Sequence, residues 1–395
     1  MKKAFFLGLL LMIGSGSIFA ADKLNPIITS VPSLTITPDA RAAGMGDVGA
    51  ATDPDVNSQA WNPAKYVFSK SSAGVAVNYT PWLKKLVDDI NLLYVSGYYK
   101  WNELNALSAS LRYFSLGEIE LANMDGSMLG VSGRPFEMAI DVAYSRMLSQ
   151  YWSAAVALRY IHVNFGAISN VQGGLEPGNA FAADIAAFYQ HPLDIGAEGS
   201  KIAAGLTLSN LGTKISYDDG NTENYLPANM RLGGSFTYAF DEYNKLSVNL
   251  DLNKLMVPST SYKLTQITAA DNQHTSYGDE YVATVAEAGV ADESVISSMF
   301  KSFSDSKLSE ELKEIAIAAG LEYSYNNQFF LRGGYFYEDK SKGNRQFWTF
   351  GAGFKLNMLS LDASYSLASN SNPLDQTLRV SLAFDIDGIR SLINN

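Results

Sequence analysis

Hydrophobic and polar residues alternate strictly along several long stretches of the chain. In residues 136–145 one face collects the apolar side chains Phe136, Met138, Ile140, Val142 and Tyr144. The opposite face collects Glu137, Ala139, Asp141, Ala143 and Ser145. The same period of two residues recurs in residues 246–253, 359–367 and 378–386. This period predicts β-strands with one apolar and one polar face.

The alternating stretches are longer than ordinary soluble strands. Soluble strands usually contain about five or six residues, whereas a tilted strand needs about nine to eleven residues to cross a membrane. We predict fourteen strands, at residues 72–81, 89–101, 104–115, 136–149, 151–165, 179–191, 200–210, 228–241, 245–254, 313–325, 328–338, 345–356, 358–368 and 377–386. An even number of antiparallel strands can close into a barrel. The expected fold is all-β, a fourteen-stranded antiparallel transmembrane β-barrel over residues 72–386.

Two further patterns favour this barrel over a water-soluble β-sandwich, whose strands would also alternate. Aromatic residues gather near predicted strand ends, as at Trp82, Trp101 and Trp152, where such rings suit the membrane–water boundary. The connections after the second, fourth, tenth and twelfth strands are very short, whereas those after the third, fifth, seventh and ninth are long. Short periplasmic turns and long outer loops are typical of outer-membrane barrels.

The first twenty residues have the layout of a secretory signal peptide. Lys2 and Lys3 precede an apolar stretch too short to span a bilayer, and small residues follow up to Ala20. The absence of cysteine excludes disulfides, thiolate metal sites and cysteine nucleophiles. The formal net charge of −11 disfavours a nucleic-acid partner, which needs a basic surface. We expect an integral protein of the bacterial outer membrane with loops exposed at the cell surface.

Residues 22–71 precede the first predicted strand and are expected to form a plug, or hatch, inside the barrel. A fourteen-stranded lumen is too wide for the side chains of the wall alone to fill. The lumen-facing phase of the strands carries charges of both signs, including Arg112, Asp141, Arg159, Asp184, Arg231, Asp251, Glu322, Arg332, Asp362 and Arg379. Asp39, Arg41 and Asp47 of the hatch are candidates for pairing with them. The alternative is a hydrated pore whose wall charges face water.

Glycines of the hatch segment match the pattern G-x-G-x-x-G at Gly44, Gly46 and Gly49. A dinucleotide site would need a preceding strand, a following helix and a βαβ unit, and the sequence predicts none of them. We interpret these glycines as positions for tight turns and close packing under the barrel wall. Residues 53–57 likewise indicate local turn chemistry, because the glycine and the distant glutamate of a calcium loop are missing.

The segment from residue 255 to residue 312 is predicted to be a long, partly helical extracellular loop. Residues 279–289 and 292–304 are predicted as short helices with acidic or serine caps. The second helix has an apolar face made of Val295, Ile296, Met299, Phe300 and Phe303. This face either folds down over the barrel mouth or forms a docking surface for another protein. Residues 387–395 remain as a C-terminal tail.

The sequence offers no set of residues for catalysis, so we expect no enzyme activity and no bound cofactor or metal. An outer-membrane lipid deacylase would need a nucleophile, a base and an orienting acid within reach of one another. The three histidines, His162, His191 and His274, have no evident partners of this kind. No G-x-S-x-G motif follows the predicted signal peptide.

A stretch of about thirty residues in the hatch segment resembles a known family. Residues 37–47 read TPDARAAGMGD, and they are followed by Asp53-Pro54-Asp55, by Asn57 and by Trp61-Asn62-Pro63-Ala64. This pattern resembles the N-terminal signature of the PorV family, outer-membrane components of the type IX secretion system of Bacteroidetes. Its Asn-Pro-Ala element is also similar to the hatch of the long-chain fatty acid transporter family. The resemblance implies a hatch motif at Asp39, Arg41, Gly44, Gly46, Asp47, Asn62 and Pro63.

The resemblance also implies a function in protein secretion. A PorV-like protein would bind secreted cargo by its C-terminal β-domain signal as the cargo leaves a large outer-membrane translocon. It would then carry the cargo to a surface attachment complex with the PorU sortase, PorQ and PorZ, where cargo is linked to a lipopolysaccharide anchor. The alternative is a transporter of long-chain fatty acids or other hydrophobic small molecules across the outer membrane.

Overall fold

A computed structural model describes residues 26–84, 87–122, 128–166, 175–258, 262–266, 281–285, 294–368 and 377–387. The predicted signal peptide, His274, nearly all of the predicted C-terminal tail and part of the long loop lie outside these residues.

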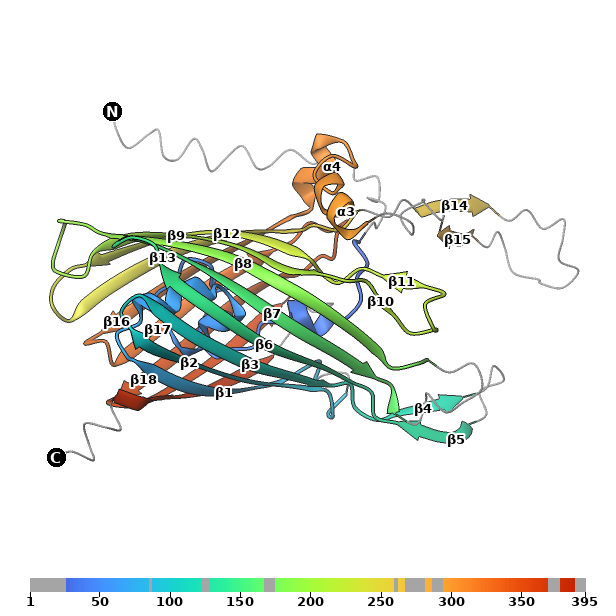
Figure 1. Ribbon diagram of the computed structural model, residues 1–395, viewed down its shortest axis with the longest axis horizontal. Coiled ribbons are helices and arrows are strands. Elements are labelled where there is room, and N and C mark those ends of the chain that lie inside the picture. Colours follow the sequence, from blue (N-terminus) through green and yellow to red (C-terminus); the bar gives the residue numbers. More distant parts are fainter. Residues whose placement is uncertain are drawn as a thin grey trace, which may run out of the picture.

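Fourteen strands form one closed antiparallel barrel, as the sequence predicts (Figure 1). In barrel order they are β1 (Ala73–Pro81), β2 (Asn91–Asn102), β3 (Asn105–Ser115), β6 (Phe136–Met147), β7 (Trp152–Asn164), β8 (Gly178–Pro192), β9 (Lys201–Gly212), β12 (Asn229–Ala239), β13 (Asn244–Leu255), β16 (Ile315–Tyr325), β17 (Phe329–Tyr337), β18 (Gln346–Leu356), β19 (Leu359–Ala368) and β20 (Leu378–Asp385). Strand β1 pairs with β20, which closes the barrel. All fourteen predicted strands are confirmed, with ends that differ by only a few residues.

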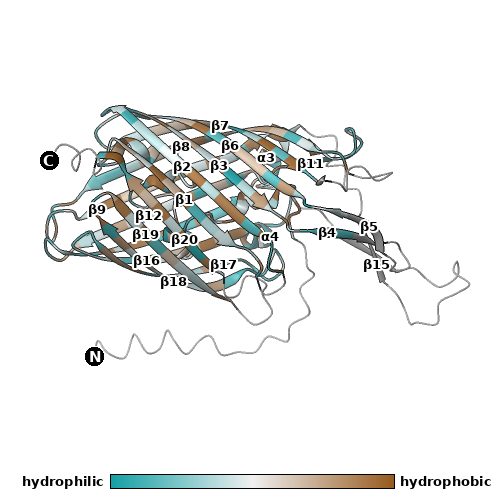
Figure 2. Cartoon of the chain, turned by 90° about the horizontal axis from the view of Figure 1, so that it is seen from below, coloured by the Kyte–Doolittle hydropathy of each residue, from teal (hydrophilic) through white to brown (hydrophobic). Residues whose placement is uncertain are grey.

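The period of two residues separates the outside of the barrel from its interior. In β6, Ile140 and Val142 are 43% and 48% exposed on the outer surface, whereas Ala139, Asp141 and Ala143 between and beside them are buried. Figure 2 shows this alternation as hydrophobic and hydrophilic colours along the strands. An apolar outer wall matches a lipid environment, and a polar inner wall needs polar partners inside the lumen.

The two ends of the barrel differ in the length of their connections. At the short-turn end, strands are joined by tight turns, for example through Asn326, Asn327 and Asn357, which adopt positive φ angles that asparagine tolerates. The long-loop end carries the strand pairs β4 (Ile119–Ala122) with β5 (Met128–Gly133), β10 (Ile215–Ser216) with β11 (Glu223–Asn224), and β14 (Tyr262–Gln266) with β15 (Tyr281–Val285). It also carries the helices α3 (Val295–Lys301) and α4 (Leu308–Lys313) (Figure 1).

One of the two predicted loop helices is wrong. Residues 281–285, within the predicted helix 279–289, form strand β15 and pair with β14. The sequence Tyr-Val-Ala-Thr-Val is rich in β-branched and aromatic residues, which favour a strand once a partner strand is available. The predicted helix 292–304 is confirmed as α3, and α4 was not predicted. In the described part of the chain, no helix is long and apolar enough to cross a membrane.

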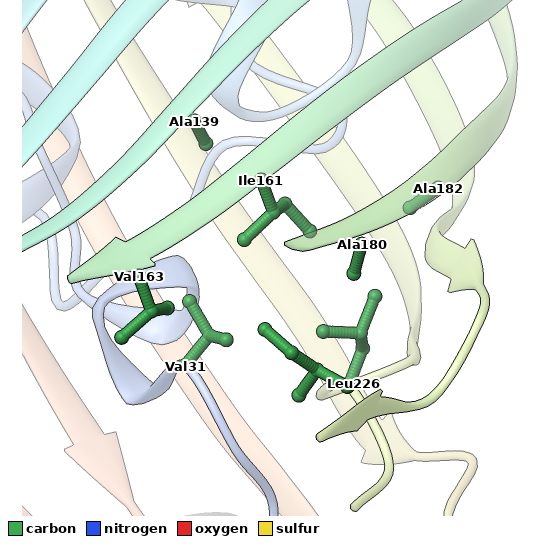
Figure 3. Close-up of a cluster of buried hydrophobic side chains, with 8 residues drawn as sticks. Val31, Ala139, Ile161, Val163, Ala180, Ala182 and Leu226 are labelled. Carbon is green, nitrogen blue, oxygen red and sulfur yellow. The ribbon is translucent and has the colours of Figure 1, made fainter. Parts of the chain in front are cut away.

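The N-terminal segment lies inside the ring of strands, where Figure 1 draws it in blue. It contains the short helices η1 (Pro32–Thr35), α2 (Ala40–Ala43), η2 (Val56–Ala60) and η3 (Pro63–Phe68). Apolar side chains of the segment pack on small and apolar side chains of the wall. Val31 joins Ile161, Val163 and Leu226, as Figure 3 shows, and Met45 packs with Phe336. The core of the molecule is therefore the contact between this segment and the inner wall.

Candidate functional site

Asp39 organises the first helix of the N-terminal segment. Its carboxylate accepts a hydrogen bond from the backbone N–H of Ala42 at 2.9 Å and thereby caps α2. The same carboxylate accepts one from the indole N–H of Trp61 at 2.6 Å. Burial, together with the nearby charge of Asp55, raises the pKa of Asp39 to about 6. Asp39 thus joins α2 to the residues around η2 and η3 rather than to the wall.

Arg41 joins the segment to the barrel wall through ion pairs. Its guanidinium donates to both carboxylate oxygens of Glu322 on β16, at 3.0 and 2.9 Å, and to Asp55 at 2.7 Å. Glu322 also pairs with Arg332 on β17, which contacts Asp362 on β19. The result is a chain of alternating charges across three strands, with the hatch at one end. Two-point pairing of arginine with a carboxylate fixes geometry as well as charge.

The glycines of the segment allow its backbone to approach the wall closely. A Cβ atom on Gly44 would lie 3.0 Å from the Cα of Gly351. Gly46 has φ +70°, and a Cβ atom there would lie 2.7 Å from the backbone nitrogen of Tyr335. The backbone N–H of Gly46 donates to the hydroxyl of Thr349 on β18 at 2.8 Å. These contacts agree with the interpretation of the glycines as packing positions.

Asp47 and the Asn62-Pro63 pair also meet the wall, largely through backbone groups. The backbone carbonyl of Asp47 accepts a hydrogen bond from Arg231 at 3.0 Å. The Asn62 side chain caps η3 by accepting from Ala64, and it donates to the carbonyl of Ala187 on β8 at 2.9 Å. The carbonyl of Pro63 accepts from Ser145 on β6 at 2.8 Å. All seven residues of the predicted hatch motif therefore lie inside the barrel, and all of them except Asp39 contact the wall.

Some residues that secure the segment were missed by the sequence analysis. Lys65 is 1% exposed and donates to the carbonyl of Gly49 at 2.8 Å and to the hydroxyl of Thr52 at 3.1 Å. Burial lowers the pKa of Lys65 to about 8. Asp251 of the wall accepts hydrogen bonds from the backbone N–H groups of Gly49 and Ala50. The alternation of β13 indicated that Asp251 faces inward, but nothing local indicated that Lys65 would be buried.

Among the described residues, two cavities lie inside the barrel on either side of the N-terminal segment. The cavity toward the long-loop end has a volume of about 390 Å³ and is lined by charged residues such as Arg112, Arg159 and Asp184, together with Trp61. The cavity toward the short-turn end has a volume of about 440 Å³. In the first cavity Arg159 pairs with Asp184 at 2.8 Å and with Asp141. The lumen-facing charges are thus largely paired with each other or with the hatch segment.

Part of the apolar face predicted for residues 292–304 packs against the barrel, and the rest of it is exposed. Met299 packs against the end of the barrel, near Met256 and Val257, and Ser298 shares a hydrogen bond of 2.6 Å with the hydroxyl of Tyr225. Ile296 and Phe300 point away from these contacts and are 70% and 76% exposed. Val295 is half-buried, and Phe303 is exposed but lies under the ammonium group of Lys254.

Helix α4 adds further exposed apolar side chains and is held by ion pairs. Leu308 and Leu312 are 75% and 60% exposed. Lys254 of β13 pairs with Glu311 at 2.9 Å, and Lys342 pairs with Glu314 at 3.0 Å. We define the outer helix surface as Ile296, Phe300, Phe303, Leu308 and Leu312.

The described histidines lie in surroundings that suit a structural role. His162 contacts the side chain of Asn179 at 2.9 Å and the ring of Phe136. His191 packs against the rings of Tyr151 and Tyr189. Neither interaction supplies the serine or carboxylate partner that hydrolytic catalysis requires. Asp305, Glu311 and Glu314 lie close together, but Lys254 and Lys342 already bind the last two.

A closed barrel with an apolar outer wall, short turns at one end and long loops at the other is the architecture of bacterial outer-membrane proteins. The family model "Type IX secretion system protein PorV" matches residues 19–262, and the chain belongs to this family. The protein is accordingly an integral protein of the outer membrane, and its short-turn end faces the periplasm.

Solved structures with the same architecture are distant in sequence. The TodX deltaS2S3 mutant monoaromatic hydrocarbon channel is 12% identical, with a TM-score of 0.51 over 88% of this chain and 98% of that chain. The Ralstonia pickettii toluene transporter TbuX is 12% identical, with a TM-score of 0.49 over 90% and 99%. A Pseudomonas aeruginosa FadL homologue is 10% identical, with a TM-score of 0.46 over 92% and 99%. At such identities the likeness concerns the fold alone. No curated protein matches the chain significantly.

Proposed function

We propose that this protein is a non-enzymatic cargo carrier of type IX secretion. It binds the C-terminal β-domain signal of secreted proteins as they leave the translocon. It then delivers them to the attachment complex that contains the PorU sortase, PorQ and PorZ. Membership of the PorV family supports the assignment to type IX secretion.

The observation that carries the carrier function is the outer helix surface. Four of its five apolar side chains stand on α3 and α4, and Phe303 lies in the turn between them, at the long-loop end of the barrel (Figure 1). Burying one such side chain contributes roughly 1.5 to 3 kcal/mol, so a partner that covered several of them would bind tightly. Met299, Ser298 and the lysines under α4 hold the two helices against the barrel. The helices therefore offer a supported surface rather than a loose loop.

Purification from native membranes tests this function. The tagged protein, solubilised gently, is expected to bring down secreted proteins that share a C-terminal β-domain, together with a sortase-like protease. The double variant Ile296→Ser/Phe300→Ser is expected to lose at least nine-tenths of this cargo at unchanged abundance of the barrel. Mass spectrometry with isotope labelling measures both quantities.

The matched control is Ile119→Ser, which removes a 41% exposed side chain from the β4–β5 pair, elsewhere at the same end of the barrel. Retention of cargo by this control and loss by the double variant would assign binding to the outer helix surface. Equal cargo on both variants and the parent would contradict that assignment. Absence of cargo from the parent itself would contradict the carrier function.

The second candidate is transport of long-chain fatty acids or other hydrophobic small molecules. The two cavities on either side of the N-terminal segment favour it, because a ligand would need such spaces along its path. The paired charges that line both cavities weigh against an apolar ligand. A purified barrel that carries stoichiometric fatty acid in lipid extracts, and no protein partner, would favour this candidate over the carrier.

A further inference from the structure

The cavity at the short-turn end has a rim rich in lysine. Its lining includes four lysines, Lys70, Lys201, Lys245 and Lys355. Lys201 pairs with Asp53 at 2.6 Å, and Lys355 lies 3.9 Å from Asp385. Among the described residues, no carboxylate forms an ion pair with Lys70 or Lys245. The cavity lining as a whole carries six cationic side chains and five carboxylates. Arg41 and Arg332 are paired with carboxylates, so Lys70 and Lys245 are the cationic groups of the lining that have no ion pair among the described residues.

Three of these lysines are close enough to influence one another. Lys201 on β9 lies opposite Thr237 of β12, and Lys245 on β13 lies opposite Ala239, two residues further along the same strand. Lys70, Lys201, Asp53 and Glu198 all act electrostatically on Lys245. Lys201 and Lys245 are half-buried, and Lys70 is exposed. Like charges held together repel each other, although Asp53 and Glu198 offset part of this repulsion at Lys245, and a bound anion relieves it further.

The local backbone leaves room for the Lys245 ammonium group at the mouth. Gly199, in the turn between β8 and β9, has φ +105°, and a Cβ atom there would lie 2.9 Å from the Lys245 nitrogen. The side chains that line the cavity beside the lysines include Phe68, Tyr98 and Phe330. The site thus combines unpaired ammonium groups with aromatic surface. It opens inside the ring of strands, so the wall separates it from lipid headgroups.

We propose that the periplasmic mouth of the barrel binds a carboxylate-bearing peptide segment of a periplasmic partner. The ammonium groups of Lys70 and Lys245 contact the carboxylates, and Phe68 and Phe330 contact apolar side chains of the same segment. This site is separate from the outer helix surface, because the two lie at opposite ends of the barrel. It does not depend on the cargo-carrier function.

Binding of a defined peptide to the purified full-length protein tests the site. The probe is fluorescein-labelled Glu-Phe-Glu-Phe-Glu, measured by fluorescence anisotropy in detergent at low salt. The matched peptide Gln-Phe-Gln-Phe-Gln keeps the rings and removes the charges. We expect the first peptide to bind at least tenfold more tightly than the second. We also expect its affinity to fall as salt is raised, because salt screens exposed charges.

Variants locate the binding. Lys70→Gln/Lys245→Gln is expected to weaken the acidic peptide at least tenfold, and Lys70→Gln alone severalfold. The single variant, at an exposed position, keeps the test valid if the double variant folds poorly. The control Lys84→Gln/Lys340→Gln removes two exposed lysines at the opposite end and is expected to change nothing. Equal weakening by the control, equal binding of the two peptides, or displacement by inorganic phosphate at concentrations where acetate has no effect would overturn the proposal.

Discussion

Most side chains of the barrel interior have partners within the protein, whereas the apolar side chains of the outer helix surface are left exposed. Inside, even charged residues such as Arg41 and Glu322 find partners, and the N-terminal segment meets the wall through backbone and side-chain hydrogen bonds. Outside, Ile296, Phe300 and Leu308 remain uncovered although they are apolar. Folding within one chain supplies partners for most polar groups of the first region, although a few buried atoms, such as Nε of Arg379, have none among the described residues. The second region is left with surface that another molecule can cover.

Among the changes considered, removing Arg41 should weaken the attachment of the N-terminal segment to the barrel wall most strongly. Arg41→Ala leaves Glu322 and Asp55 without their shared partner, and loss of one member of a buried ion pair costs about 3 kcal/mol or more. We expect faster hydrogen exchange across residues 31–69 and higher single-channel conductance in planar bilayers. The control Arg134→Ala removes the ion pair between Arg134 and Glu118, whose side chains are 79% and 44% exposed. Because this pair is exposed, its loss should lower the free energy of unfolding by less than about 1 kcal/mol. Equal effects of the two variants would contradict the view that Arg41 secures the hatch.

Filling the close contact at Gly46 should have a somewhat smaller effect. A Cβ atom at φ +70° meets three backbone atoms of the wall within 2.9 Å, so Gly46→Ala should destabilise by about 2 to 3 kcal/mol through strain and overpacking. The matched control is Gly234→Ala on β12, where a Cβ atom meets nothing within 4 Å. Urea unfolding in detergent, followed by tryptophan fluorescence, measures both. A stable Gly46→Ala protein would show that the wall yields at this point.

For a change of one pH unit, the smallest effect expected is a dependence of stability on pH through Lys65. Burial holds the pKa of Lys65 at about 8 in the folded protein, below its usual value of 10.5. Between these values the unfolded chain binds more protons, so this group raises stability as pH increases, by at most about 1.4 kcal/mol per unit. The difference in unfolding free energy between the parent and Lys65→Met should therefore change between pH 8 and 10. A constant difference would mean that Lys65 keeps its usual pKa.

Features that depend on residues close together in the sequence could be predicted from it, whereas contacts between residues far apart in the sequence could not. Strand positions were predicted well because a two-residue period is a local property that each strand carries by itself. The glycines at 44 and 46 could be interpreted as packing positions, but their partners Gly351 and Tyr335 are hundreds of residues away. The helix predicted at 279–289 was wrong. A short apolar segment can form either a helix or a strand, and here the pairing of residues 281–285 with β14 makes it a strand.

By itself, the sequence determined the barrel, its strand number and the side of each strand that faces lipid, since these follow from alternation along the chain. It also carried the hatch signature, because that signature is a contiguous stretch of residues. Only the tertiary structure decided which charges meet, such as Arg41 with Glu322, and that Lys65 is buried. It also divided the amphipathic face of α3, partly burying Met299 and exposing Phe300. Helical spacing places both residues on one face, and only the position of the barrel end determines which of them is covered.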